Sequence, residues 1–332
     1  QVTCPDIAGI MGAFGAALLA RDRYHGQKTT MLPLEEIEQL TYKTSAARCQ
    51  GCQNHCMLTV SVFPGGRRHV SGNRCEKALR GESAAKPGEN IFAYKRERMF
   101  AYPPLEPENA PRGEIGIPRV LNMYENYPFW ATFFRDLGFR VILSPFSTRA
   151  IYELGMESIP SESECYPAKL AHGHAQWLID HGVKTIFHPC VFYEHQEVPG
   201  AQNHFNCPIV VSYPENIKNN VEAVTDGSVR YLHPFLAFTN EKVASDRLVQ
   251  FCKEVWNIPE KETRHAAHLA WEEQRRAKAD VRAAGAKALA DMEKNGGSGI
   301  VLAGRPYHVD PEINHGIPEL IAAYGLTVLT ED

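Results

Sequence analysis

The chain has 332 residues, of which 44% are hydrophobic and 22% are charged, and its formal net charge is -4. These values are typical of a soluble globular protein, and the length allows two or more domains. They argue against the strongly basic surface that a nucleic-acid or acidic-membrane partner needs, and no apolar run has membrane-spanning length. We therefore expect a cytoplasmic protein with nine reduced cysteines, so that grouped cysteines favour metal binding or catalysis over disulfides.

The first 46 residues predict a helix and a connection. Residues 7–21 are rich in Gly and Ala at helical spacing, which allows close approach to another element. Residues 26–46 read as a polar linker with a turn or two of helix at 34–40. The chain begins without methionine and stops directly after a predicted strand, so we expect a segment of a longer protein.

Four cysteines gather in residues 47–80. Cys49, Cys52 and Cys56 lie in one short stretch, and Cys75 follows a predicted hairpin made of an apolar run, a Pro-Gly-Gly turn and a second run. The hairpin would bring Cys56 and Cys75 together at its open end. Four converging thiolates bind either Zn²⁺ or a 4Fe–4S cluster. The C-x2-C-x3-C spacing is closer to the cluster pattern, but cysteines at the base of a hairpin also occur in zinc ribbons, so both remain open.

Residues 113–240 alternate strands and helices, after an extended, Pro-rich linker at 81–112. Apolar runs predict strands at 115–121, 139–143, 183–187 and 209–212, and helical spacing predicts helices at 128–137 and 168–180. Buried strands separated by helices imply an α/β fold with a doubly wound parallel sheet, similar to flavodoxin or Rossmann folds. Such a sheet binds ligands in the crevice at the carboxyl ends of its strands. The candidate residues that follow the strands are Tyr124, Glu125, Asn126, Ser144, Ser147, His188, Pro189, Cys190, Ser212 and Tyr213.

Two cysteines fall at this predicted crevice. Cys165 precedes the helix at 168–180, with Pro167 in the first turn, and the positive end of a helix dipole favours a thiolate. Cys190 follows the third predicted strand. The two thiols could ligate an exposed cluster, or one or both could be ordinary small buried residues. Cys207 could belong to the same crevice.

Three further residues are candidates for catalysis. Glu125 follows the first strand, and Lys169, one turn after Cys165, could hold an anionic group or keep the thiol ionised. His172 and His174 are two positions apart and do not share a helix face, so we expect no joint metal site, but one of them can face the crevice as a general base. We take Glu125, Lys169 and His172 as the candidate catalytic residues.

The remaining residues predict a helical connection and a further α/β element. Residues 241–296 are rich in Ala, Glu, Lys and Arg at helical spacing, and residues 297–332 read as strand, helix and strand, the start of a second α/β domain. The loop after the first of these strands carries Arg305 and His308, which are typical of loops that bind phosphate or carboxylate and equally of ordinary surface loops.

Several long motifs resemble one family. They are Ile117-Pro-Arg-Val-Leu-Asn-Met-Tyr-Glu-Asn-Tyr-Pro-Phe-Trp, Cys165-Tyr-Pro-Ala-Lys-Leu-Ala-His-Gly-His, Gly304-Arg-Pro-Tyr-His-Val-Asp-Pro-Glu-Ile-Asn-His and the Arg48-Cys-x-Gly-Cys … Gly-Asn-Arg-Cys75 module. Together they resemble the large fused protein related to 2-hydroxyacyl-CoA dehydratases and their activators, also called CoA-substrate-specific enzyme activase. The resemblance covers nearly the whole chain.

The resemblance implies a fold, cofactors and a function. In that family an activator with an actin/Hsp70-like ATPase fold comes first; residues 1–25 look like its last helix, so ATP would bind only upstream. The later domains resemble subunits of the dehydratases and of double-cubane-cluster reductases, in which cysteines hold an iron–sulfur cluster between two similar α/β domains. Carried over, Cys165 and Cys190 would supply ligands from the first domain, and the remaining cysteine would lie beyond Asp332. The implied function is ATP-driven electron transfer at very low potential.

Two functions of different classes therefore compete. In the first, the chain binds 4Fe–4S clusters in an activase, and substrate chemistry takes place in a crevice lined by Glu125, Cys165, Lys169 and Cys190. In the second, the Cys49–Cys75 module is a structural zinc knuckle and the α/β domain is a docking or CoA-binding module without chemistry of its own. A plain small-molecule-binding domain without a cluster is a third reading. Expected partners are the upstream ATPase domains and the downstream α/β domain, with an acyl-CoA or other small substrate and a homodimer also considered.

Overall fold

The computed structural model describes residues 8–26, 28, 31–50, 55–73 and 87–332. Contacts divide the chain into two compact units, residues 1–47 with 59–71 and residues 48–58 with 72–332. The predicted parallel α/β sheet lies in the second unit, and the strand pairing predicted for the Pro-Gly-Gly hairpin lies largely in the first.

The first unit contains short helices and most of a three-stranded sheet. Its elements are η1 (Ala8–Ile10), α1 (Met11–Asp22), α2 (Leu34–Glu38), β1 (Lys43–Arg48), β2 (Met57–Val62), η2 (Pro64–Gly66) and β3 (Arg68–Ser71). The sheet order is β1-β2-β3, and β2 pairs antiparallel with β3, with Val60 opposite Val70. Gly65 and Gly66 in the turn have φ values of 81° and 80°, which only glycine adopts without strain. The residues predicted as a linker at 26–46 include α2 and most of β1; sequence reasoning did not predict that strand.

A four-stranded parallel sheet organises the second unit. Its strands are β4 (Glu114–Ile117), β5 (Arg140–Leu143), β6 (Thr185–Phe187) and β8 (Arg230–Leu232), in the order β5-β4-β6-β8. Neighbouring strands pair in parallel, with Ile115 opposite Val141 and Ile186 opposite Tyr231. The strand order reverses between β4 and β6, which makes the sheet doubly wound, as predicted, and places a topological switch point at their carboxyl ends.

Helices cover both faces of this sheet. They are α4 (Met123–Asp136), α5 (Arg149–Gly155), η5 (Met156–Ser158), α6 (Tyr166–Asp180), α7 (Pro208–Asn220), α8 (Glu222–Thr225) and α9 (Glu241–Trp256). Ile115 and Ile117 of β4 are fully buried in a core shared with α4 and α9. Gly116 between them faces the other side, where an added Cβ would lie 2.8 Å from Val183. Alternate β4 residues therefore pack against different helix layers.

The predicted fourth strand at 209–212 is wrong, because those residues begin α7. Pro208 starts the helix, and Val210, Tyr213, Pro214 and Ile217 are buried at the spacing of one helical face. The short apolar run was one side of this helix and not a complete buried strand. The fourth strand of the sheet is β8, about twenty residues later in the chain.

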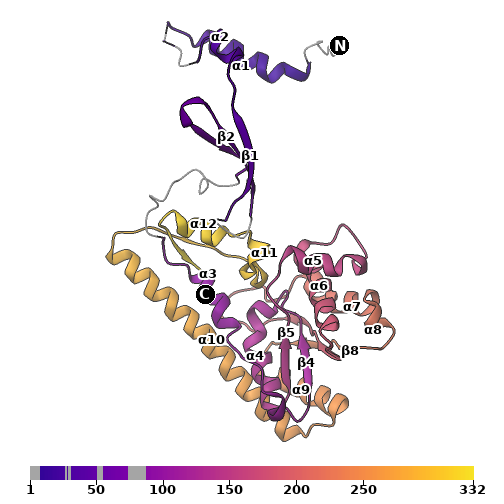
Figure 1. Cartoon of the computed structure of the whole chain (residues 1–332). Coiled ribbons are helices and arrows are strands. Elements are labelled where there is room, and N and C mark those ends of the chain that lie inside the picture. The colour runs from indigo at the N-terminus through magenta and orange to yellow at the C-terminus, as the bar shows by residue number, and fades with distance from the viewer. Residues whose placement is uncertain (1–7, 27, 29–30, 51–54, 74–86) are drawn as a thin grey trace, which may run out of the picture. The chain divides into compact units, whose positions relative to one another are not determined.

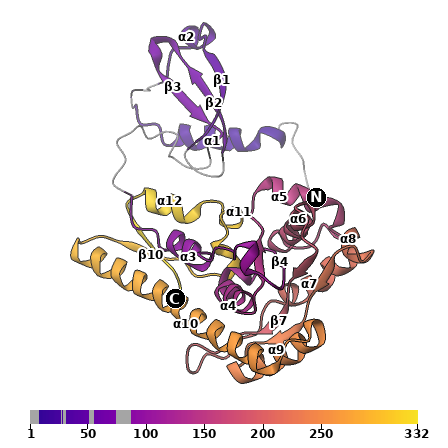
Figure 2. The ribbon, with the colours of Figure 1, turned by 60° about the horizontal axis from the view of Figure 1, so that its bottom comes forward.

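A long helix spans the second unit. α10 (Glu260–Lys294) contacts α9 near its start and β11 (Thr327–Leu329) farther along, and the two ribbon views agree on this arrangement (Figures 1 and 2). β11 pairs in parallel with β10 (Gly299–Val301). The intervening residues form η6 (Pro306–Val309), α11 (Pro311–Asn314) and α12 (Ile317–Ala323). A further parallel pair, β7 (Cys190–Tyr193) with β9 (Phe235–Ala237), lies beyond the four-stranded sheet.

The segment predicted as an extended linker at 81–112 contains a helix. α3 (Ile91–Met99) begins at Asn90, whose side chain accepts a hydrogen bond from the amide of Ala93, and it contacts α4, α10 and β11. Ile91 and Met99 are each 1% exposed and pack against α10. The prediction of an extended chain is therefore wrong for residues 91–99, because the many charged residues of α3 concealed its two anchoring apolar side chains.

Candidate functional site

Two thiols lie at the beginnings of adjacent helices. Cys165 directly precedes α6 and Cys207 directly precedes α7, and a proline occupies the first turn of each helix. Cys165 is exposed and Cys207 is half-buried, and neither thiol forms a capping hydrogen bond to its own helix. α6 contacts α7, and each of these two helices presents its positive end beside one of the thiols.

Tyr307 of η6 connects these thiols electrostatically. Burial raises the pKa of Tyr307, and the nearby Cys207 and Cys165 raise it further. Tyr307 also packs beside Cys207 against the hydrophobic cluster that α6 and α7 share. The loop after β10 thus meets the starts of both helices at this point. Sequence reasoning gave Cys207 little weight, although a Cys immediately before Pro and a helical apolar pattern could have identified it.

Cys190 has different surroundings. It begins β7 and is 3% exposed, and burial, with a further contribution from Glu215, raises the pKa of its thiol to about 11. Its other electrostatic neighbours are Lys218 and Tyr231. The predicted pairing of Cys190 with Cys165 stays a prediction, and the shared neighbour Tyr307 favours Cys207 as the partner of Cys165.

Lys169 and His172 lie on α6, as predicted, but both are engaged within the protein. Lys169 donates a 2.7 Å hydrogen bond to the carbonyl oxygen of Glu162, in the loop that leads to Cys165. His172 is fully buried, and its Nδ1 lies 2.7 Å from the hydroxyl of Ser158. Burial lowers the pKa of His172 to about 4, so the ring is neutral at pH 7, and its Nε2 has no hydrogen-bond partner among the described residues.

His174 occupies a buried polar cluster behind the strand ends. Its ring nitrogens lie 2.8 Å from the hydroxyl of Ser144 and 2.9 Å from that of Ser147. The Ser144 hydroxyl accepts a hydrogen bond from the backbone amide of Arg119, and the Ser147 hydroxyl donates one to Asp310. Ser147 therefore accepts from Nε2 of His174, and the neutral ring accepts a hydrogen bond from Ser144 at Nδ1. Burial, with further contributions from Arg119 and His188, lowers the pKa of His174 to about 3.

Close packing of α6 against α5 explains why His172 and His174 are buried. α6 crosses α5 at Gly173, where an added Cβ would lie 1.8 Å from the carbonyl oxygen of Ile151. The glycine between the histidines therefore permits the helix contact that buries both rings.

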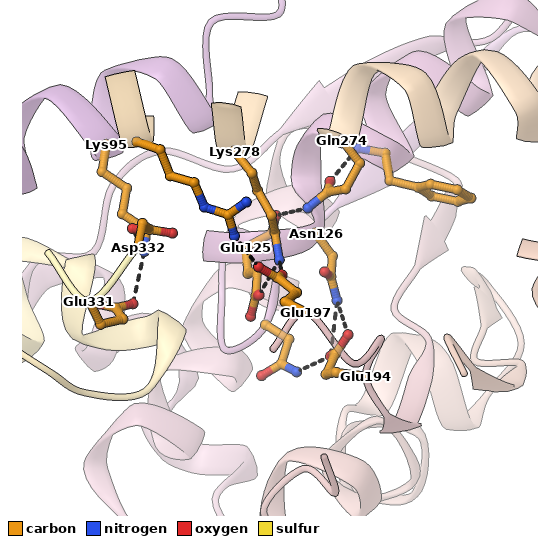
Figure 3. Close-up of polar contacts among 12 residues, drawn as sticks. Lys95, Glu125, Asn126, Glu194, Glu197, Gln274, Lys278, Glu331 and Asp332 are labelled. Atoms are coloured by element: carbon orange, nitrogen blue, oxygen red, sulfur yellow. Dashed lines mark hydrogen bonds and ion pairs between the residues drawn. The ribbon is translucent and has the colours of Figure 1, made fainter. Parts of the chain in front are cut away.

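Glu125 lies in a network of ion pairs that links α4 to α10. Lys278 donates a 2.7 Å bond to its carboxylate and also contacts Glu197, and Gln274 donates to the backbone carbonyl oxygen of Glu125 (Figure 3). A cavity of about 360 Å³ is lined by Glu125, Glu197, Lys278 and residues of α3 and the chain after β11. The predicted catalytic carboxylate is thus neutralised by an ammonium group at the wall of a cavity.

Glu194 lies next to this network and was missed by sequence reasoning. Its carboxylate accepts bonds of 2.7 Å from Asn122, 3.1 and 3.3 Å from Asn126, and 2.7 Å from Asn206. Burial raises the pKa of Glu194 and the nearby Glu125 raises it further, while the three amides oppose this. Figure 3 shows Asn126 and Glu194 directed toward each other. Asn122 and Asn126 follow the β4 strand, so only their positions, and not their partner, could be predicted.

The four predicted metal-ligating cysteines are described only in part. Cys52 and Cys75 lie outside the described residues. The amide of Cys49 donates a 2.9 Å bond to the carbonyl oxygen of Cys56, and His55 between them has φ 40°. The fourfold site therefore stays a prediction. The described ranges contain no group of three or more His, Cys, Asp or Glu side chains arranged so that they could hold a metal ion.

Comparison with known proteins gives one family. Residues 114–332 match the model of a family described as the CoA enzyme activase uncharacterised domain. Searches of curated proteins and of solved structures gave no match. The matched range covers the parallel sheet, the helix-start thiols and the Glu125 network. Within the described part of the chain, no helix is both long and apolar enough to cross a membrane.

Proposed function

Because the chain belongs to the family of CoA enzyme activase domains, we propose that it is the redox component of an activase and passes an electron to a partner enzyme through an iron–sulfur cluster. The observation that carries this proposal is the pair of thiols, Cys165 and Cys207, each at the start of one of two contacting helices and each near Tyr307. We propose these two as cluster ligands, in place of the pair Cys165 and Cys190.

The thiols of Cys165 and Cys207 are suitable ligands for an iron–sulfur cluster, but two described ligands are too few to hold a cluster on their own. Thiolate is the usual protein ligand of iron–sulfur clusters, and four ligands are the norm. The two thiols supply half of that set, so further ligands would have to come from outside the described residues. Backbone N–H groups at helix starts stabilise negative charge, and hydrogen bonds to cluster sulfurs tune the reduction potential.

The surrounding residues have defined roles in this proposal. Lys169 closes the loop before Cys165 through its bond to the Glu162 carbonyl oxygen, which holds the thiol at the helix start. Glu164 accepts hydrogen bonds from Tyr213 and Asn216 of α7, both 2.7 Å long, so the residue next to Cys165 joins the two helices. These contacts position the thiols without taking part in electron transfer.

Iron and sulfide analysis of protein purified without oxygen tests the proposal. We expect iron in the wild-type chain, with visible absorption from sulfur-to-iron charge transfer, and a loss of most of both in Cys165→Ala and Cys207→Ala. Cys252→Ala is the matched control, because Cys252 is a fully buried thiol in the hydrophobic core. Iron that persists when Cys165 and Cys207 are both replaced, or that is absent from the wild-type chain, would contradict the assignment.

The alternative is a structural zinc knuckle beside a docking or CoA-binding module. The backbone bond between Cys49 and Cys56, which places two predicted ligands next to each other, supports a metal site in this module. Stoichiometric zinc in a colourless sample, lost in Cys56→Ala and retained in Cys165→Ala, would support this alternative. Full-length protein is the right material, since the ligands can be spread over the chain.

A further inference from the structure

One face of α10 lines a second cavity, next to the Glu125 network. The cavity has a volume of about 380 Å³, and Trp271, Arg275, Lys278 and Arg282 line it from α10 at the spacing of one helical face. His195, Gln196 and Glu197 line it from the segment between β7 and α7. Its volume is within the range of small-molecule sites.

The α10 face combines an aromatic ring with three cationic groups. Trp271 is 5% exposed, its ring lies 6.2 Å from that of His195, and its indole N–H has no partner among the described residues. Arg275 pairs with Glu241, and Arg282 pairs with Glu197 at 2.5 Å. Lys278 pairs with both Glu125, which lines the neighbouring cavity, and Glu197. The carboxylates that pair with these cations are partly exposed to solvent.

Glu197 lines the cavity together with the two cations that it pairs with. Its two carboxylate oxygens contact Lys278 and Arg282 separately, and it lines both this cavity and the neighbouring one of about 360 Å³. Figure 3 shows its side chain meeting that of Lys278 beside Glu125. Moving this one side chain would join two cavities that already share Lys278 and Arg282.

The segment that carries Glu197 has few other attachments to α10. Gln196 bonds to the carbonyl oxygens of Val198 and Ala201 within the same segment, and Val198 is 64% exposed. His195 bonds to Thr239, which is outside α10. The ion pairs of Glu197 are therefore the main polar link between this segment and the helix, and partly exposed ion pairs are weak.

We propose that the α10 cavity binds a small molecule that carries a phosphate group beside a flat apolar ring, and that Glu197 holds the place of the phosphate on Lys278 and Arg282 until the ligand arrives. A guanidinium and an ammonium on adjacent helical turns suit a phosphate, which brings more acceptor oxygens and more charge than a carboxylate. Trp271 and His195, which both line the cavity, supply the surface for the ring. This site is separate from the thiols and goes beyond the proposed redox function.

Calorimetric titration of the full chain with phenyl phosphate and with inorganic phosphate tests the site. Glu197→Gln removes the competing carboxylate charge, so we expect it to bind phenyl phosphate about fivefold more tightly than the wild type. Lys278→Met should bind it at least about tenfold more weakly, since a charge-assisted bond is lost. Inorganic phosphate should bind more weakly than phenyl phosphate in every variant.

Two exposed residues give matched controls. Lys287→Met changes an exposed lysine of the same helix that pairs with Asp291, and Glu254→Gln changes an exposed carboxylate of α9; both should bind like the wild type. Arg282→Met, at a half-exposed position, replaces Lys278→Met if that variant does not fold. The proposal is overturned if Glu197→Gln binds no more tightly than the wild type, if Lys287→Met weakens binding as much as Lys278→Met, or if neither the wild type nor Glu197→Gln binds. Iron content is unaffected in all these variants, so this result and the cluster assignment can fail independently.

Discussion

Cys165 and Cys252 are both helix-associated thiols, yet the fold gives them opposite surroundings. Cys165 is exposed at the start of α6, where backbone N–H groups point outward, whereas Cys252 is fully buried on the core face of α9. Burial raises the pKa of Cys252 to about 12, and Cys190 shows the same effect with a pKa of about 11. The contrast shows that solvent access and position along the helix, and not residue type, decide which thiol can ligate a metal or react.

The largest expected difference between the two positions, 165 and 252, arises when a charged side chain is placed at each. We expect Cys252→Asp to lower the free energy of unfolding by about 4 kcal/mol or more, because the buried carboxylate loses its hydration and the nearby cation, Arg112, is already paired with Glu262. Cys165→Asp, its control, should change that free energy by less than about 1 kcal/mol and in the stabilising direction, since Asp is a favourable residue before a helix. Urea unfolding of the two variants measures both values, and equal destabilisation would contradict the contrast.

Thiol alkylation tests the difference between exposed and buried thiols in the wild-type chain. At pH 8 a thiol with a pKa of about 11 is only about 0.1% thiolate, and burial further blocks the reagent. We expect Cys165 of metal-free, folded protein to react with iodoacetamide about a thousandfold faster than Cys190 or Cys252. Mass spectrometry of the modified peptides gives the rates, with unfolded protein as the reference. Similar rates in folded protein would mean that Cys190 and Cys252 are not protected.

Burial shifts the pKa of a histidine as it shifts that of a thiol, and this shift predicts how the stability of the protein depends on pH. Because the pKa of His174 is lowered to about 3 in the folded state, the unfolded chain, with a pKa near 6.5, takes up a proton first. The stability is complete above about pH 6.5 and falls as the pH approaches 3. Through His174, the free energy of unfolding falls by roughly 3 kcal/mol as the pH is lowered from 7 to 4.5.

Urea unfolding at a series of pH values measures this dependence. His174→Gln should make the curve shallower in that range but not level, because burial also lowers the pKa of His172 to about 4 and that of His188 to about 3. His268→Gln should leave the shape of the curve unchanged, since the His268 side chain is 61% exposed. A wild-type curve that stays level from pH 7 to 4.5 would show that His174 is accessible to protons in the folded protein.

Periodicity predicted much of the sheet. Three strands were placed correctly to within a few residues, and the helix predicted at 168–180 is α6. The failures have a common physical origin. Residues 209–212 are one side of the amphipathic helix α7, and α3 is anchored by Ile91 and Met99 among many charged residues, so in neither case does a short window contain enough of the pattern.

The candidate sites could be predicted only in part for a similar reason. Cys165, Lys169 and His172 were located on the right element, and Glu125, predicted to lie between a strand and a helix, is in the first turn of α4. The partner of Glu125 is distant in the chain. Lys278, which pairs with Glu125, lies 153 residues later. Glu194 meets Asn122 and Asn126 only because β7 runs beside the start of α4, and no local pattern indicates that meeting.

The order of residues alone determined that Cys165 begins a helix, because a proline two positions later cannot continue a helix from before but favours its first turn. It also determined the parallel α/β class, since apolar strands and helices alternate along the chain. Only the tertiary structure decided which groups meet: Tyr307 lies near Cys207 and Cys165, and Glu197 pairs with Lys278 and Arg282. Those meetings depend on how α6 packs on α7 and how the segment after β7 lies on α10, which are properties of side-chain packing over long separations.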